Sequence, residues 1–192
     1  MKTSLIIAAC MASVAGFCGA PAGAAALPAG STITGSSSSA ATSLLGLDSG
    51  FADVPGSNVT TLAAADLEYL TGDYQLAIDF FTDGVVQFYD NGGFGSLAGS
   101  YTLAFSFGLA EDVTGFTLTD LSALSSGTVT SSVLDAHSIS ITLNDVVFNA
   151  PFASFSAQIS TASAVPEPGS LALLGGGLAL LLAARCRKPF IV

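Results

Sequence analysis

The central part of this chain is predicted to fold as an all-β domain, an antiparallel β-sandwich of jelly-roll-like form. Three observations predict this fold. Apolar residues alternate with polar ones along several short segments, glycine-containing turns separate these segments, and only one segment has a helical pattern. The 192-residue chain also has 13 Phe and no Trp, and phenylalanine rings can fill the space between two packed sheets.

Five segments show the alternation most clearly, and in most of them the opposite face carries Ser and Thr. This alternation is typical of an antiparallel sheet that packs on one face and meets water on the other. Together with shorter apolar runs, these segments predict seven or eight strands. The apolar faces are Tyr74, Leu76, Ile78 and Phe80; Tyr101, Leu103, Phe105 and Phe107; Phe116 and Leu118; Ile139, Ile141 and Leu143; and Ala153, Phe155, Ala157 and Ile159.

A hairpin is expected around Asp83-Gly84, because this dipeptide between apolar runs is typical of a two-residue turn. A two-residue turn opposes Phe81 to Val86 and Asp79 to Phe88. Neither face of that hairpin is cleanly polar, so either both faces are buried or a bulge shifts the pairing. Residues 61–70 (TLAAADLEYL) are predicted to form the one helix of the domain.

Charge is distributed very unevenly along the chain. The basic residues are Lys2, Arg185, Arg187 and Lys188, whereas thirteen of the fourteen acids lie from Asp48 to Asp145. The part between the two ends therefore has a formal charge of −13, from 13 acids and no Lys or Arg. Such a surface repels phosphate backbones, so nucleic acid is not an expected partner.

The N-terminal stretch has the features of a secretory signal peptide. Lys2 is followed by an apolar run, and small residues precede Ala24 and Ala26, where signal peptidase cleavage is expected. The three cysteines, Cys10, Cys18 and Cys186, all lie outside the predicted domain, which therefore has no disulfide and no thiolate metal site.

The C-terminal stretch has the features of a membrane anchor. Residues 170–184 are uncharged and would form a helix of about 22 Å, shorter than a hydrocarbon core of about 30 Å. Arg185, Arg187 and Lys188 follow this segment and act as a stop-transfer cluster on the cytoplasmic side, so the domain is expected outside the cytoplasm. An extended segment, Val165-Pro166-Glu167-Pro168, precedes it.

The order of Val165-Pro166-Glu167-Pro168, a short apolar helix and an Arg-rich end closely resembles the PEP-CTERM sorting signal of Gram-negative bacteria. Segments of this kind also carry the name ice-binding protein C-terminal, which implies no ice binding. The resemblance implies recognition of Pro166, Glu167 and Pro168 by an exosortase, a membrane transpeptidase that cleaves near the motif. It further implies a surface or extracellular protein, often associated with exopolysaccharide and biofilm.

These observations divide the chain into six parts. The expected signal peptide (residues 1–26) leads into a flexible Gly/Ser-rich segment (27–43) and the β-sandwich domain (44–160). After the domain come a linker with the Val-Pro-Glu-Pro motif (161–169), the transmembrane helix (170–184) and the basic tail (185–192).

The domain shows no recognisable catalytic or metal site, and no cofactor is predicted. His137 is the only histidine; a triad with Asp135 or Asp145 is conceivable, but no G-x-S-x-G elbow accompanies it. The acids around the predicted hairpin, Asp79, Asp83 and Asp90 with Asn91, are oxygen ligands of the kind that suit Ca²⁺, and solvated surface acids are the preferred interpretation.

The sequence therefore predicts a non-catalytic exported protein that signal peptidase and exosortase process. It is expected to be held at the inner membrane by its C-terminal helix and then to reach the cell surface or the medium. There its Ser/Thr-rich faces could bind extracellular polysaccharide. Two alternatives stay open, namely a secreted polysaccharide-acting hydrolase and a plain single-span anchored envelope protein.

Overall fold

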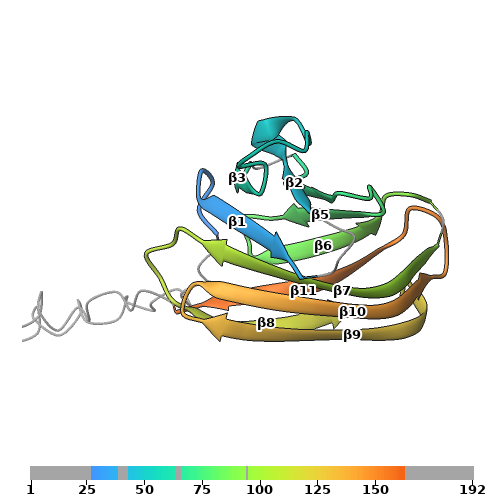
Figure 1. The fold of residues 1–192 in the computed structure, drawn as a ribbon. Helices are drawn as coiled ribbons and strands as arrows, with labels where there is room; N and C mark the ends of the chain where they lie inside the picture. Colours follow the sequence, from blue (N-terminus) through green and yellow to red (C-terminus); the bar gives the residue numbers. More distant parts are fainter. Residues whose placement is uncertain (1–26, 39–42, 64–65, 94, 163–192) are drawn as a thin grey trace, which may run out of the picture.

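The computed structural model describes residues 27–38, 43–63, 66–93 and 95–162, which form two antiparallel sheets packed face to face (Figure 1). The predicted β-sandwich is therefore confirmed. The sheets have the orders β3-β1-β7-β10-β9 and β2-β4-β5-β6-β11-β8. The strands are β1 (Thr32–Ser37), β2 (Leu44–Gly46), β3 (Val59–Thr61), β4 (Tyr69–Thr71), β5 (Leu76–Phe80), β6 (Val85–Asp90), β7 (Ser96–Phe107), β8 (Val113–Asp120), β9 (Leu124–Asp135), β10 (Ser138–Phe148) and β11 (Ser154–Thr161).

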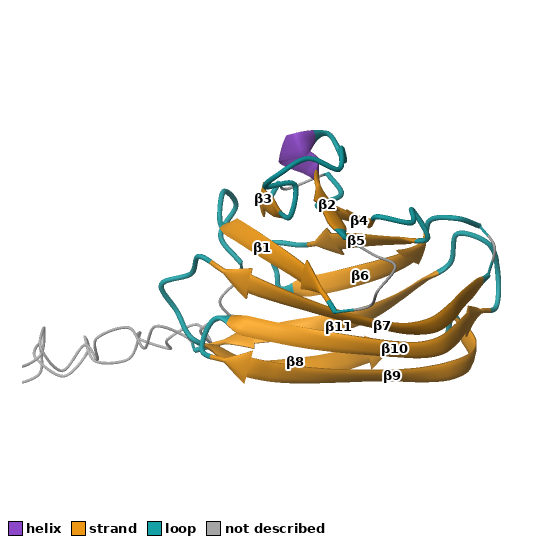
Figure 2. Cartoon of the chain, in the orientation of Figure 1, coloured by secondary structure: helices purple, strands orange, loops and turns teal. Residues whose placement is uncertain are grey.

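The chain alternates between the sheets in the manner of a jelly roll along part of its course. From β6 to β9 each strand lies in the sheet opposite to the one before it, whereas β4, β5 and β6 follow one another in the six-stranded sheet (Figure 2). Strands β9 and β10 form a long antiparallel pair at one side of the five-stranded sheet. Among the described residues the only helical element is a single 3-10 turn, η1 (Leu47–Ser49).

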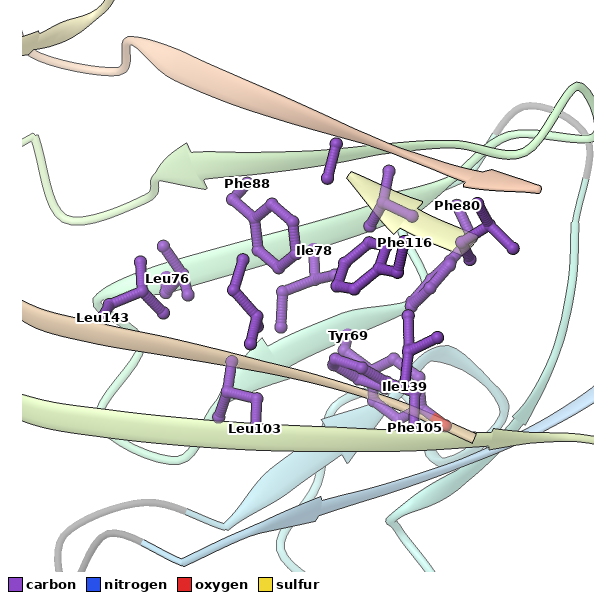
Figure 3. Close-up of a cluster of buried hydrophobic side chains, with 14 of the residues drawn as sticks. Tyr69, Leu76, Ile78, Phe80, Phe88, Leu103, Phe105, Phe116, Ile139 and Leu143 are labelled. Carbon is purple, nitrogen blue, oxygen red and sulfur yellow. The ribbon is translucent and has the colours of Figure 1, made fainter. Parts of the chain in front are cut away.

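Aromatic side chains from both sheets meet in the centre of the sandwich (Figure 3). Phe105 on β7 lies between Tyr69 and Phe80 of the other sheet, with ring centroids 5.6 Å and 5.0 Å away. The Phe80 and Phe105 rings meet edge to face, the geometry that aromatic quadrupoles favour. The Tyr69 hydroxyl donates a 2.6 Å hydrogen bond to the Ile33 carbonyl and so joins the two sheets.

The predicted alternation is confirmed on the long strands and wrong at one position. Tyr101, Leu103, Phe105 and Phe107 are all buried on β7, and Phe155, Ala157 and Ile159 are buried on β11. Tyr74, in contrast, lies in the turn before β5 and is 51% exposed. Its place in the apolar pattern therefore does not reflect a place in the core.

The β5–β6 hairpin differs from the predicted pairing by one residue. Phe80 lies opposite Val86 and Ile78 opposite Phe88, so these four side chains share one buried face. The turn has three residues instead of two. The Gly84 amide donates to the Phe81 carbonyl, and Gly84 adopts a φ of 85°. A type I turn followed by a left-handed glycine makes a bulge, and this bulge shifts the register.

The folded part begins earlier than residue 44, so the prediction of a flexible lead-in over residues 27–43 is corrected for the described residues 27–38. Strand β1 pairs with both β3 and β7, and Leu27 and Ile33 are 1% and 0% exposed. This segment has few apolar residues, so its sequence resembles a linker. Its backbone pairing and these two side chains are what place it in the sandwich.

The predicted helix over residues 61–70 is wrong. Strand β3 ends at Thr61 and strand β4 begins at Tyr69. Leu62 and Tyr69 are both buried in the core, and Leu70 pairs with Ala77 of β5. Sheet pairing and burial therefore outweigh the helix propensity of the three alanines.

The described residues contain no helix with the length and apolar character that a membrane crossing requires. The predicted signal peptide (1–26), the predicted membrane helix (170–184) and the predicted basic tail (185–192) lie outside the described residues.

We predict that Phe105→Ala lowers the free energy of unfolding by about 3–5 kcal/mol, because it leaves a cavity beneath two neighbouring rings. Denaturant unfolding of the purified protein measures the change. Val54→Ala is the control, since Val54 is 48% exposed and its truncation should change stability by less than about 0.5 kcal/mol. Equal effects of the two substitutions would contradict the assignment of Phe105 to the core.

Candidate functional site

The outer surface of the five-stranded sheet carries a regular array of small polar side chains, which we call the hydroxyl face. It arises because every second residue of β1, β7, β9 and β10 points away from the core. The residues of this face are Thr34, Ser36, Thr102, Ser106, Thr128, Thr130, Ser132, Ser138, Ser140, Thr142 and Asn144. None of these side chains is charged, although the exposed Asp135 lies opposite Ser138 at one end of the face. Ser138 and Ser140 are only 8% and 9% exposed.

The strand register sets the side chains of the hydroxyl face in rows across the sheet. Thr102, Thr142 and Thr130 lie opposite one another on β7, β10 and β9. The Thr102 and Thr142 hydroxyls are 3.2 Å apart, and those of Ser106 and Ser138 are 2.8 Å apart. Rows in a sheet are about 4.8 Å apart between strands and about 6.7 Å apart along a strand. The face can therefore offer neutral hydrogen-bonding groups to an extended, uncharged ligand.

The structure does not assemble the conceivable Ser-His-Asp triad. The Asp135 carboxylate accepts a 2.8 Å hydrogen bond from the backbone amide of His137 instead of from its ring. The ring Nδ1 of His137 is buried and has no hydrogen-bond partner. Asp145 lies at the bulge of β10, where its carboxylate accepts from the Gly99 amide at 3.0 Å.

The acids proposed as Ca²⁺ ligands also lie apart. Asp83 is in the β5–β6 turn, and Asp90 ends β6, seven residues and about 20 Å further along the strand. Asp90 is 1% exposed and accepts a hydrogen bond from the Gly95 amide at 2.9 Å. Asp79 lies opposite Gln87, on the face of the sheet that points away from the core, whereas Asp90 lies on the core face. No group of three metal-ligating side chains occurs in the described part of the chain.

Within the described residues, the fold does bring two acids, Glu68 and Asp79, together as a carboxyl pair. Glu68 is 0% exposed, and its carboxyl oxygens accept hydrogen bonds from the Phe80 amide at 2.7 Å and the Ala63 amide at 3.0 Å. From the sequence, Glu68 is expected to point away from the core, because its neighbour Tyr69 points inward. The sequence gives no sign that the chain after β3 folds over the Glu68 side chain and buries it.

Burial raises the pKa of Glu68 to about 7, and repulsion from Asp79 adds to this rise, while the hydrogen bonds from Phe80 and Ala63 oppose it. Burial also raises the pKa of Asp79, and the hydrogen bond with Glu68 lowers it. The nearby Asp66 adds further negative charge beside Asp79. The pair therefore holds a proton that two exposed carboxyl groups would have lost well below neutral pH.

The comparisons with known proteins identify the C-terminal segment. Residues 164–188, which are 25 of the 192 residues, match the PEP-CTERM protein-sorting motif. The chain thus carries a sorting signal, and this signal is the PEP-CTERM motif that the sequence resembles. No curated protein and no solved structure matches the chain.

The match spans every residue that the sequence singled out for sorting. It includes Val165, Pro166, Glu167 and Pro168, together with Arg185, Arg187 and Lys188. All of these residues lie outside the described part of the structure, so their individual roles stay predictions. The motif implies that the protein is exported, is processed by an exosortase and is sorted to the membrane or cell surface.

We predict that Glu68→Gln removes part of the pH dependence of stability. The folded pKa of Glu68, about 7, lies above the usual value of 4.5, so the native state binds more protons between these values. Stability therefore falls as pH rises from about 4.5 through 7, by about 3 kcal/mol from this group. Denaturant unfolding at pH 5 and pH 8 measures the slope, which should flatten in the variant. Asp83→Asn, in the exposed turn, is the control and should keep the wild-type pH dependence. The assignment would be refuted if the pH dependence flattened in Asp83→Asn and stayed unchanged in Glu68→Gln.

Proposed function

We propose that this protein is a non-catalytic component of the extracellular matrix, associated with exopolysaccharide or biofilm after an exosortase has removed its C-terminal helix. The observation that carries the proposal is the PEP-CTERM motif at residues 164–188, attached to a folded β-sandwich. In this proposal the C-terminal helix is a temporary membrane anchor that presents the motif to the enzyme. Signal peptidase removes the N-terminal segment.

The surface of the domain supports association with neutral polysaccharide. The hydroxyl face offers uncharged donors and acceptors, and the described residues include neither Lys nor Arg. An acidic domain of this kind repels anionic polymers and anionic lipid headgroups, and it leaves neutral polyhydroxyl chains as compatible ligands. The Asp135 carboxylate is bonded to the backbone amide of His137 and not to its ring, so no Ser-His-Asp arrangement supports hydrolysis and a binding role is favoured.

We predict that replacing Pro166, Glu167 and Pro168 together by alanine blocks processing. The variant should stay in the membrane fraction with its basic tail attached, because the change removes the residues of the matched motif, including two prolines that restrict φ. Mass spectrometry and cell fractionation, in cells with an active exosortase, measure the mature mass and the released fraction. Ser163→Ala with Ser170→Ala, which flank the motif, is the matched control.

Release of the triple variant at the mass and amount of the wild type would defeat the exosortase proposal. An uncut wild-type chain would favour a plain single-span anchored envelope protein. If the wild type degrades a polysaccharide, and His137→Ala is still secreted but has lost this activity, the protein is a hydrolase and not a matrix component.

A further inference from the structure

We infer that Tyr74 and Phe152 form a stacking site for the rings of a neutral sugar polymer at one end of the sandwich. This inference deepens the proposed matrix function and rests on it for the class of ligand. It assigns the contact to two loop aromatics, which neither the strand pattern nor the sorting motif indicates.

Both aromatic side chains are strongly exposed. Tyr74 is 51% exposed in the β4–β5 turn, and Phe152 is 69% exposed in the β10–β11 turn. Single exposed apolar residues are common on protein surfaces and need no explanation by themselves. What distinguishes these two is their shared neighbour, together with a left-handed backbone that Phe51 alone shares among the other described aromatic residues.

Each ring is held on a strained backbone. Tyr74 and Phe152 both have a φ of 58°, in the left-handed region that bulky side chains rarely adopt. A glycine would adopt this conformation without cost, so folding alone gives no reason for an aromatic residue there. Strain of this kind persists at positions where function requires the side chain.

The two residues border the same short segment, Asn91-Gly92-Gly93. The Asn91 side-chain amide donates to the Tyr74 carbonyl at 2.9 Å, and the Asn91 backbone amide donates to the Gln75 carbonyl at 2.9 Å. The tip of the Phe152 ring lies directly over Gly93, where a Cβ would be 2.7 Å from it. Since consecutive Cα atoms are about 3.8 Å apart, Asn91 and Gly93 are within about 8 Å of each other.

The fold brings these loops together. The connections β4–β5, β6–β7 and β10–β11 all lie at the same end of the sandwich, at the right in Figure 1. The Asp90 amide donates to the Ala153 carbonyl at 3.0 Å, which ties the β10–β11 turn to the end of β6. Loops at the end of a sandwich are common positions for binding sites on a rigid scaffold.

The chemistry of this end favours a neutral sugar. Aromatic faces supply apolar contact to the C–H surface of a pyranose, and the neighbouring Gln75 and Asn91 supply amide groups for its hydroxyls. Asp73 lies in the β4–β5 turn and the buried Asp90 ends β6 nearby, and no Lys or Arg occurs among the described residues to attract an anion. These acids disfavour acidic polymers and anionic membranes as ligands.

The test is affinity electrophoresis of the processed, released protein in native gels. The gels contain dextran, hydroxyethylcellulose or galactomannan as neutral probes, or alginate as an acidic one. We expect at least one neutral polymer to retard the wild type, and Tyr74→Ala and Phe152→Ala each to weaken the apparent affinity about 3- to 10-fold. Val54→Ala is the matched control: it truncates an exposed apolar residue of another loop and should bind normally.

A second readout separates binding from folding. Tyr74→Gly and Phe152→Gly should each raise the Tm by about 2–4 °C, because glycine relieves the left-handed strain, and each should lose retardation. A fall in the Tm would mean that the rings are structural and would contradict the inference.

Three further results would overturn the site. The first is a wild-type protein that none of the neutral polymers retards. The second is a pair of alanine variants that bind as the wild type does. The third is a loss, in both variants, of binding only to phosphatidylglycerol vesicles or to a second copy of the chain. Normal export and C-terminal processing in these cases would leave the proposed sorting and release standing. The failure of the sugar site is thus distinguishable from the failure of the proposed function.

Discussion

The constraint on which the rest of this structure depends is that the folded domain contains no Lys or Arg. Its thirteen acids have only His137 as a conceivable cationic partner, so charge interactions within the domain are almost all repulsive. Stability must therefore come from apolar burial and backbone pairing. The ring cluster around Phe105, the Tyr69 hydroxyl bond between the sheets and the long β9–β10 pair are the contacts that meet this requirement.

The same constraint links the fold to the proposed function. A surface of acids and hydroxyls stays dissolved outside the cell and does not adhere to anionic lipids. The only basic cluster, Arg185 to Lys188, lies at the far end of the sorting motif, where the proposal removes it with the helix. In the proposal, what remains is a domain that engages neutral polymers through its hydroxyl face and through the Tyr74 and Phe152 rings.

The strands with long alternating patterns, such as β7 and β11, could be predicted from sequence because core burial alone fixes their faces. The register of the β5–β6 hairpin could not, since it depends on the left-handed Gly84 bulge. The sequence does not predict strand β1, because Ile33 is almost its only apolar residue. The site residues were harder still. The sorting motif is predictable because it is a local pattern, but the Glu68–Asp79 pair and the Tyr74–Phe152 end depend on loops that only the fold brings together.

The dependence of stability on salt tests the central claim most directly. If the charges of the domain only repel one another, NaCl screens the repulsion, and the free energy of unfolding of the released protein should rise by about 1 kcal/mol from 10 mM to 300 mM NaCl. Sorbitol at equal osmolarity controls for effects other than screening. A free energy of unfolding that falls with NaCl over this range would show that attractive ion pairs hold the domain together, and would contradict the account.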